Sequence, residues 1–253
     1  MDRTVPPLFH ETPPADAVAA PRSDASIAIV IPVLNEAGGI VQVLDGLQHF
    51  RRQGAEVVVV DGGSTDGTPA LARPWADEVV AAPRGRGRQM NAGAAQTRSE
   101  ILLFLHADTR LPPTAATLIR EAVGHGARWG RFDVRIAGTV AGLGMVACLM
   151  NWRSRLTGIA TGDQAIFVTR EAFQRGGGFP DIPLMEDIVF SDRMRRMSPP
   201  ACLREKVSTS GRRWEKHGLL RTILTMWWLR LRFHFGASPH GLAREYGYAP
   251  DES

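Results

Sequence analysis

The sequence contains little cysteine and almost no lysine. Only two of its 253 residues are cysteines, Cys148 and Cys202, and both lie among apolar residues without metal-ligand spacing. They form neither a disulfide framework nor a zinc motif, which is typical of a reducing compartment, so we expect a cytoplasmic protein. Only two of the 30 basic residues are lysines. The net charge of +4 therefore comes from scattered arginines without a long basic run, and we do not expect nucleic acid as a partner.

Long apolar stretches are also missing. No segment reaches about eighteen consecutive apolar residues, so we do not expect a membrane-spanning helix. Residues 1–25 contain five prolines and lack the apolar core of a signal peptide, which predicts a disordered N-terminal tail. Hydrophobic residues make up 44% of the chain and charged residues 22%, as in ordinary globular proteins. We expect one domain over residues 26–240 and a short tail at 241–253.

The first half alternates apolar, β-branched runs with helical patterns. Strands are predicted at 27–33, 56–60, 79–82 and 101–105, with helices at 40–50 and 89–97 and a short one after the turn that ends at Gly67. This alternation predicts an α/β fold with a doubly wound, mostly parallel sheet and helices on both faces. Ligands of such sheets bind at the carboxyl ends of the strands, where Asn35, Glu36, Asp61 and Asp108 all fall. We therefore expect these polar residues to converge at one edge.

The second half is less regular. Strands are predicted at 131–136 and 165–169, and helices at 114–123, 140–150, 185–197 and 219–235. No internal repeat and no clear linker interrupts the chain. The second half is therefore expected to complete the same domain.

Five motifs in a fixed order carry a resemblance to a known family. They are Val-Ile-Pro-Val-Leu-Asn-Glu at 30–36, Val-Asp-Gly-Gly-Ser-Thr-Asp-Gly-Thr at 60–68, Asn-Ala-Gly at 91–93, Phe-Leu-His-Ala-Asp-Thr at 104–109 and Met-Glu-Asp at 185–187. Over about residues 27–217 the chain resembles family 2 glycosyltransferases of the GT-A fold, of the non-processive bacterial type. The resemblance implies inverting transfer of a sugar from a nucleotide-diphosphate-sugar donor to an acceptor hydroxyl. It also implies a nucleotide-binding half (26–110) and an acceptor or catalytic half (111–217), with an amphipathic helix at 218–236.

The donor would lie against the first two strand ends. Asp61 follows a buried strand, where its carboxylate can accept hydrogen bonds from a base or ribose. Alternatively it only shapes its turn, which is the role we expect for Asp66. The resemblance favours donor binding for Asp61, and it places further donor contacts at Pro32, Asn35, Glu36 and Asn91.

A divalent cation is expected as the cofactor, Mn²⁺ or Mg²⁺. The developing charge on a leaving nucleotide diphosphate must be neutralised, and a cation with hard oxygen ligands does this. Asp108 is the natural ligand. Relatives usually carry Asp-x-Asp here, whereas this chain has His106-Ala107-Asp108, so His106 is a ribose contact, a softer metal ligand or a core histidine. His217 is a candidate to complete the metal site by resemblance to other GT-A enzymes.

Arginines offer a second source of charge for the diphosphate. Arg86 and Arg88 lie on a Gly-punctuated stretch that we interpret as a loop, and they either contact the phosphates or form a solvated basic loop. The segment Ser-Gly-Arg-Arg-Trp at 210–214 resembles an element that closes the donor pocket in processive relatives, but the usual Gln is absent. Arg213 would then pair with the diphosphate, and Trp214 would stack near the acceptor.

Acceptor activation requires a base. Asp187 matches the catalytic base of the family, and Glu186 would support it. On their own, the two acids are better explained as the favourable acidic first turn of a helix, and their place downstream of the four other motifs favours the catalytic role instead. Asp163 and Gln164 are expected on the acceptor side, although a simple turn explains them almost as well.

The predicted C-terminal helix mixes Trp227 and Trp228 with arginines. Such a helix either lies in a membrane interface, which implies a lipid-linked or membrane-proximal acceptor, or packs on the core with extended arginines. Three other functions are less consistent with the sequence. A haloacid-type phosphatase would need a nucleophilic aspartate two positions before Asp108, where this chain has His106. A nucleotidyltransferase would require a basic, Gly-rich phosphate loop, which residues 35–39 lack, and a catalytically silent nucleotide-binding or membrane-surface module would not need both Asp108 and Asp187.

Overall fold

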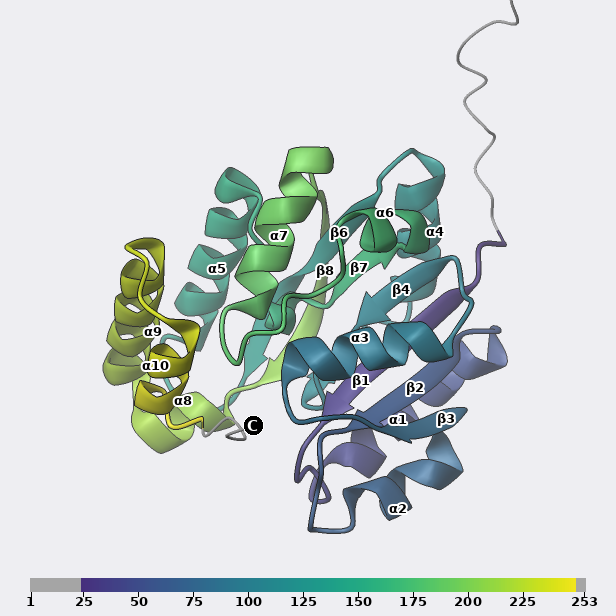
Figure 1. The fold of residues 1–253 in the computed structure, drawn as a ribbon, viewed down its shortest axis with the longest axis horizontal. Helices are drawn as coiled ribbons and strands as arrows, with labels where there is room; N and C mark the ends of the chain where they lie inside the picture. Colours follow the sequence, from purple (N-terminus) through teal and green to yellow (C-terminus); the bar gives the residue numbers. More distant parts are fainter. Residues whose placement is uncertain (1–23, 249–253) are drawn as a thin grey trace, which may run out of the picture.

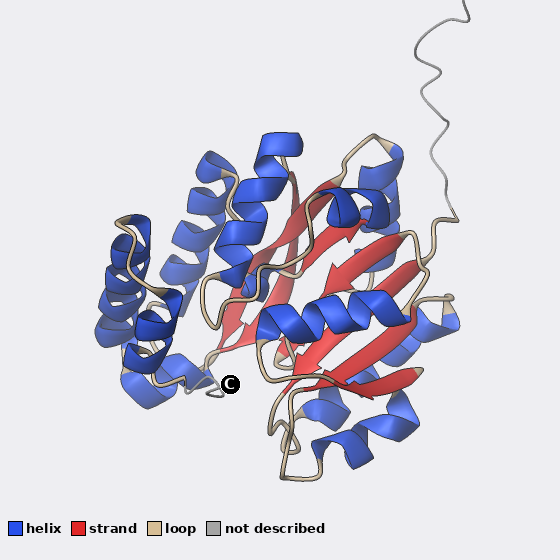
Figure 2. Ribbon diagram, in the orientation of Figure 1, coloured by secondary structure: helices blue, strands red, loops and turns tan. Residues whose placement is uncertain are grey.

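A mixed eight-stranded sheet with helices on both faces forms the centre of the protein (Figures 1 and 2). The computed structural model describes residues 24–248, so residues 1–23 of the predicted tail at 1–25 lie outside the described part. The strand order is β3-β2-β1-β4-β7-β6-β8-β5. The strands are β1 (Ile27–Val33), β2 (Glu56–Asp61), β3 (Glu78–Ala81), β4 (Ile101–Phe104), β5 (Thr109–Arg110), β6 (Trp129–Ala137), β7 (Ile166–Thr169) and β8 (Ala201–Ser210).

The predicted α/β class with a mostly parallel sheet is confirmed. Strands β3, β2, β1 and β4 are parallel, β7 is antiparallel to β4 and β6, and β8 runs parallel to β6. The helices are α1 (Ile40–Arg52), α2 (Thr68–Ala72), α3 (Arg86–Gln96), α4 (Ala115–Gly124), α5 (Leu143–Thr157), α6 (Arg170–Arg175), α7 (Glu186–Met197), α8 (Arg212–His217), α9 (Leu219–His234) and α10 (Pro239–Glu245), with short 3-10 turns η1 (Arg73–Trp75) and η2 (Gly162–Gln164).

Alternation along β1 explains the layers. Ile27, Ile29 and Ile31 face the cluster that includes α1, α4 and α5, whereas Ala28 and Val30 face the cluster that includes α3, α6 and α7. Successive side chains of a strand point to opposite faces, so an entirely apolar strand can serve two cores. This is why the unbroken apolar run at 27–33 forms an interior strand rather than an edge.

Several segments differ from the sequence-based prediction. Strand β5 and helices α6 and α8 were not predicted, and α5 ends at Thr157 rather than at residue 150. Strand β8 was not predicted, because its sequence ACLREKVSTS is largely polar and its place depends on pairing with β6. Helix α3 begins at Arg86 instead of residue 89. Residues 239–245, which overlap the expected tail at 241–253, form helix α10, whose Leu242 and Ala243 are fully buried against α9.

None of the helices within residues 24–248 combines the length and apolarity needed to cross a bilayer.

Candidate active site

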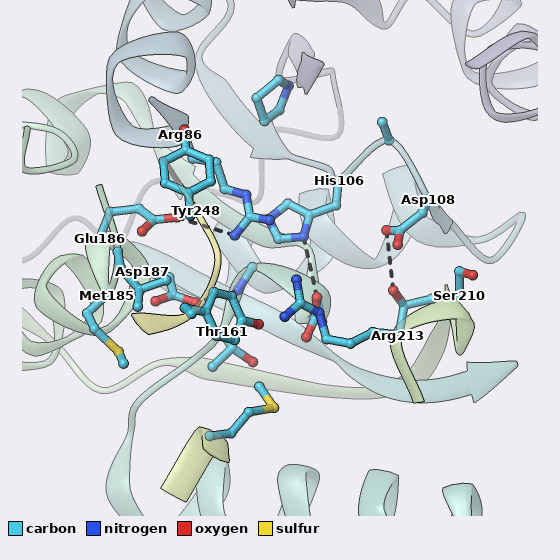
Figure 3. A pocket seen from close by; sticks show the side chains of 18 of the residues that line it. Arg86, His106, Asp108, Thr161, Met185, Glu186, Asp187, Ser210, Arg213 and Tyr248 are labelled. Atoms are coloured by element: carbon cyan, nitrogen blue, oxygen red, sulfur yellow. Dashed lines mark hydrogen bonds and ion pairs between the residues drawn. The ribbon is translucent and has the colours of Figure 1, made fainter. Parts of the chain in front are cut away.

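A pocket of about 440 Å³ lies at the carboxyl ends of β1 and β4 and is shared by both halves of the chain (Figure 3). Its walls come from the β1 and β4 ends, the first turns of α3 and α7, η2, the β8–α8 junction, α9 and the segment after α10. Ten of the sequence-predicted site residues line it: Pro32, Glu36, Arg86, His106, Asp108, Asp163, Glu186, Asp187, Arg213 and Trp214. Asn35, Asp61, Arg88, Asn91, Gln164 and His217 do not line it.

The loops after β1 and β2 hold each other through side chains. The Asn35 amide oxygen accepts a hydrogen bond from the Thr65 backbone N–H at 2.9 Å, and the Asp66 carboxylate accepts one from Ala37 N–H at 2.9 Å. Asp66 therefore has the turn role expected for it. Asn35 adopts φ 54°, a left-handed conformation that asparagine tolerates. Asn35 thus positions the neighbouring Glu36, which does line the pocket.

Asp61 also supports its own turn. Its carboxylate accepts hydrogen bonds from the backbone N–H groups of Gly63 at 3.1 Å and Ser64 at 3.0 Å, and the residue is only 7% exposed. Pairing of Asp61 with Val33 places it beside the pocket edge. A carboxylate has about four lone-pair positions, so these bonds leave acceptor capacity on Asp61.

The early start of α3 separates the two arginines. Residues two apart on a helix point in different directions. Arg86 enters the pocket, with Nη1 at 4.0 Å from Glu186 Oε1, whereas Arg88 Nε lies 2.5 Å from Asp181 Oδ1. The prediction that both arginines lie on a loop is therefore wrong, because both belong to α3. Gly87 allows this packing, because a Cβ there would lie 2.5 Å from the Pro180 carbonyl oxygen.

Two amides on α3 fix the helix against its surroundings. Gln89 is 3% exposed and donates to the carbonyl oxygens of Val33 and Val60, both at 2.8 Å, which joins α3 to the ends of β1 and β2. The Asn91 side chain both accepts from and donates to the Phe179 backbone at 2.9 Å. Asn91 therefore holds the loop before α7, whereas the role of Gln89 was not predicted from the sequence.

The turn η2 contacts both His106 and Asp187, the candidate catalytic base. His106 Nδ1 lies 3.4 Å from Asp163 Oδ1, and the Gly162 N–H donates to Asp187 Oδ2 at 3.0 Å. A Cβ on Gly162 would lie 2.2 Å from His106 Nε2, so only glycine permits this approach. Desolvation alone would raise the pKa of Asp163, but His106 and Arg86 hold it below its ordinary value. Gln164 is buried and caps η2 by a reciprocal pair of hydrogen bonds with Thr161.

Glu186 and Asp187 begin α7 after a strained residue. Met185 has φ 71°, and with Asn35 and Ala165 it is one of three non-glycine residues with positive φ within residues 24–248, all close to the pocket. Burial, followed by the charge of Asp187, raises the pKa of Glu186 to about 7. Glu186 is therefore partly protonated near neutral pH.

Asp108 faces a different set of partners. Thr209 Oγ1 lies 3.5 Å from its Oδ1, and Nη2 of Arg212 lies 4.0 Å from its Oδ2 and 3.2 Å from Glu36 Oε2. Within residues 24–248, no three His, Cys, Asp or Glu side chains are grouped so that they could hold a metal by themselves. A lone carboxylate fits a metal that takes its other ligands from substrate phosphates and water, as Mg²⁺ sites commonly do. His217, the exposed last residue of α8, does not contribute to the pocket lining.

The segment after α10 returns to the pocket. Tyr246 and Tyr248, the two tyrosines of the chain, both line it, and the Arg213 guanidinium lies 4.2 Å from the centre of the Tyr246 ring. Arg213 is therefore held over an aromatic face rather than by a carboxylate. Because residues 241–253 were predicted to be a tail, neither tyrosine was expected in the pocket. Trp214 is 8% exposed and packs into the core cluster.

The fold and the pocket are those of an α/β protein whose acidic and arginine side chains gather at the carboxyl ends of its strands. Residues 28–141 match the family described as Glycosyl transferase family 2, and this part of the chain belongs to that family. Glycosyltransferase AglE of Haloferax volcanii is 34% identical over 91 residues, which are 32% of this chain and 30% of that protein. The chain thus matches less than a third of this curated relative's length.

Solved structures share the fold. The mannosyltransferase PcManGT from Pyrobaculum calidifontis, in complex with GDP-Man and Mn²⁺, has a TM-score of 0.60 and 23% identity, over 94% of this chain and 69% of that one. Glucosyl-3-phosphoglycerate synthase from Mycobacterium tuberculosis, with Mn²⁺, UDP and glucosyl-3-phosphoglycerate, has a TM-score of 0.56 and 20% identity, over 80% and 77%. S. aureus TarS 1–349 with UDP-GlcNAc gives 0.60 and 18%, over 73% and 58%.

Proposed function

We propose that the protein transfers a sugar from a nucleotide-diphosphate-sugar to an acceptor hydroxyl, with inversion, without processivity and with a divalent cation. The observation that carries the proposal is the gathering of Asp108, Arg213 and Asp187 around one pocket, each from a different part of the chain. Relatives of the same fold whose complexes contain GDP-Man, UDP-GlcNAc or UDP support a donor of this class. We propose that it acts in the cytoplasm.

The donor would lie along the β1 and β4 ends. Pro32 and Glu36 would border the nucleoside, with Asp61 beside them using its remaining lone pairs. Arg86 and Arg213 face the pocket interior, where they would pair with diphosphate oxygens. His106, oriented by Asp163, would donate a hydrogen bond to the ribose or a phosphate.

Asp187 would remove the proton of the acceptor hydroxyl as its oxygen attacks the anomeric carbon, and the nucleoside diphosphate leaves with the bonding electron pair. The Gly162 N–H fixes one carboxylate oxygen of Asp187, and the Ile188 N–H fixes the other at 2.7 Å. A partly neutral Glu186 avoids placing a second full negative charge beside the base. Asp163 and Trp214 would border the acceptor.

Asp108 would hold the cation together with the donor diphosphate. Bound there, Mn²⁺ or Mg²⁺ would neutralise the charge that develops on the leaving diphosphate. Arg212 Nη2, at 4.0 Å from Asp108, places a positive charge beside the same oxygen atoms. A cation and Arg212 would therefore share this side of the pocket.

A donor screen tests the proposal. UDP-, GDP- and dTDP-sugars are titrated with Mn²⁺ or Mg²⁺ while binding and donor hydrolysis are measured, and no binding or turnover with any donor would refute it. With the donor identified, Asp187→Asn should abolish transfer and retain donor binding. Asp192→Asn is the matched control, because Asp192 lies on the same helix and pairs outward with Arg195 and Arg196. Full activity of Asp187→Asn would refute its role as the base.

A further inference from the structure

Exposed apolar side chains gather on two helices. Among the described residues, ten of the eleven exposed large hydrophobic side chains belong to α5, α9 or the residue that follows α9. We call this set the α5/α9 face; it comprises Met145, Leu149, Trp152, Leu156, Leu220, Leu224, Trp227, Trp228, Leu231 and Phe235. Leu71 on α2 is the other one. Scattered apolar residues are normal on a protein surface, but such a concentration marks an interaction site.

The spacing shows that each helix carries a continuous outer stripe. The α5 members follow one another at intervals of four, three and four residues, and so do Leu220, Leu224, Trp227 and Leu231 on α9. These intervals place side chains on one side of a helix. The inner side of α9 carries Leu229, which is 1% exposed. Each helix is therefore apolar on the side that packs and again on the side that faces outward.

The charged side chains of α5 and α9 themselves have one sign, although Arg155 pairs with Asp133 of β6 and Arg232 pairs with Glu245 of α10. Neither α5 nor α9 contains an aspartate or glutamate, and together they carry five arginines: Arg153, Arg155, Arg221, Arg230 and Arg232. Two copies of this face would bring like charges together, which disfavours a second copy as its partner. An anionic lipid surface provides an apolar layer below a negative one, and tryptophan is enriched at that boundary. Three of the six tryptophans of the chain lie on the face.

The face is next to the candidate active site. Met150 of α5 and Met226, Leu229 and Arg230 of α9 line the pocket, and Figure 1 shows both helices at the same end of the molecule. Arg153, whose pKa falls to about 10 through burial and then through the charge of Arg230, has two buried guanidinium nitrogens without a hydrogen-bond partner. Arg153 thus interacts with Arg230, which itself lines the pocket.

We propose that the α5/α9 face binds an anionic phospholipid surface, with both helices parallel to the plane of the membrane. Helix α9 has 16 residues and α5 has 15, and neither can cross a bilayer. The lipid contact stands independently of the proposed transfer reaction. If that reaction is also correct, the contact presents the pocket to an acceptor carried by a lipid.

Vesicle sedimentation with the full chain tests the contact. Vesicles of phosphatidylglycerol mixed with phosphatidylcholine should bind the protein, and pure phosphatidylcholine should bind it at least roughly tenfold more weakly, with the difference reduced at high salt. Leu224→Ser combined with Trp227→Ser should weaken binding by at least roughly tenfold. Leu71→Ser is the matched control and should bind as the parent does. Because Leu224 and Trp227 are 68% and 72% exposed, the double variant should keep its fold, which circular dichroism checks.

Three outcomes would overturn the proposal. One is an absence of sedimentation with either vesicle type, and another is equal binding of the double variant and the parent protein. The third is a dimer in sedimentation velocity that the double variant abolishes while vesicles bind neither form, because this would assign the face to a second copy. Donor binding measured on the same samples without vesicles distinguishes failure of the lipid contact from failure of the proposed reaction.

Discussion

Replacement of Glu186 by glutamine should change how the stability of the protein depends on pH. Glu186 is 4% exposed, and its pKa is raised from 4.5 to about 7, first by burial and then by the charge of Asp187. A raised carboxyl pKa means that the folded protein binds the proton more tightly than the unfolded chain does. The free energy of unfolding should therefore fall as the pH rises from about 4.5 through about 7, and the loss should be complete above that window.

The size follows from the shift. One pKa unit corresponds to about 1.4 kcal/mol, so the shift of Glu186 corresponds to about 3 kcal/mol of destabilisation at pH 8 relative to pH 4.5. Glu186→Gln has nearly the same volume and no charge to bury. The variant should gain about 2 to 3 kcal/mol over the parent protein between pH 5 and pH 8. The sign is thus opposite to that of an ordinary ion-paired carboxylate, whose removal costs most at neutral pH.

Urea unfolding of both proteins between pH 5 and pH 8.5, followed by circular dichroism without donor or metal, measures this difference. Glu171→Gln is the matched control, because the Glu171 side chain is 77% exposed and pairs only on the surface with Arg175. The control should track the parent protein at all pH values. If the curve of Glu186→Gln also runs parallel to the parent curve, the buried charge pair at the start of α7 does not exist as described.

Three further substitutions test other parts of the structure. Asp108→Asn should weaken donor binding in Mn²⁺ by at least roughly tenfold and have little effect in EDTA, measured by calorimetry; equal loss in both would contradict a metal role. Tyr246→Ala should raise the donor KM roughly threefold to tenfold, because the Arg213 guanidinium would no longer stack on an aromatic ring. Tyr246→Phe keeps the ring and should not raise the KM; identical behaviour of the two variants would refute the stacking argument. Gly93→Ala should cost about 1 to 3 kcal/mol in urea, because its Cβ would lie 2.4 Å from a strand side chain, whereas Gly46→Ala on the open side of α1 should be neutral or stabilising; a neutral Gly93→Ala would refute the close packing of α3.

Much of the first half could be predicted because its signals are local. Strand β1 is apolar at every position, and the turn after β2 is rich in glycine and aspartate, so pattern and turn chemistry agree. The strand-end rule then located Glu36 and Asp108 at one edge without knowledge of contacts. It could not separate Asn35 from Glu36, because the difference depends on hydrogen bonds between two loops.

Other parts of the site depend on contacts distant in sequence. Strand β8 is defined by its pairing with β6, since its own polar sequence has no clear strand pattern. Helix α10 has only 7 residues, and its order comes from Leu242 packing against α9. The predicted start of α3 was three residues too late, so Arg88 was expected on a loop, whereas it lies on the helix and contacts Asp181. A small error in a helix boundary thus becomes a large error in a binding site.

The His-Ala-Asp sequence at 106–108 illustrates how tertiary structure can restore what a motif lacks. Relatives usually carry an acid at the first position, and here His106 occupies it. The structure places Asp163, from η2, at 3.4 Å from the His106 ring, so a carboxylate is present on this side of the pocket although it comes from another part of the chain. Arg86 helps keep Asp163 ionised despite its desolvation. The number of acids beside the His-Ala-Asp segment is therefore a property of the folded pocket, and a count along the strand end alone underestimates it.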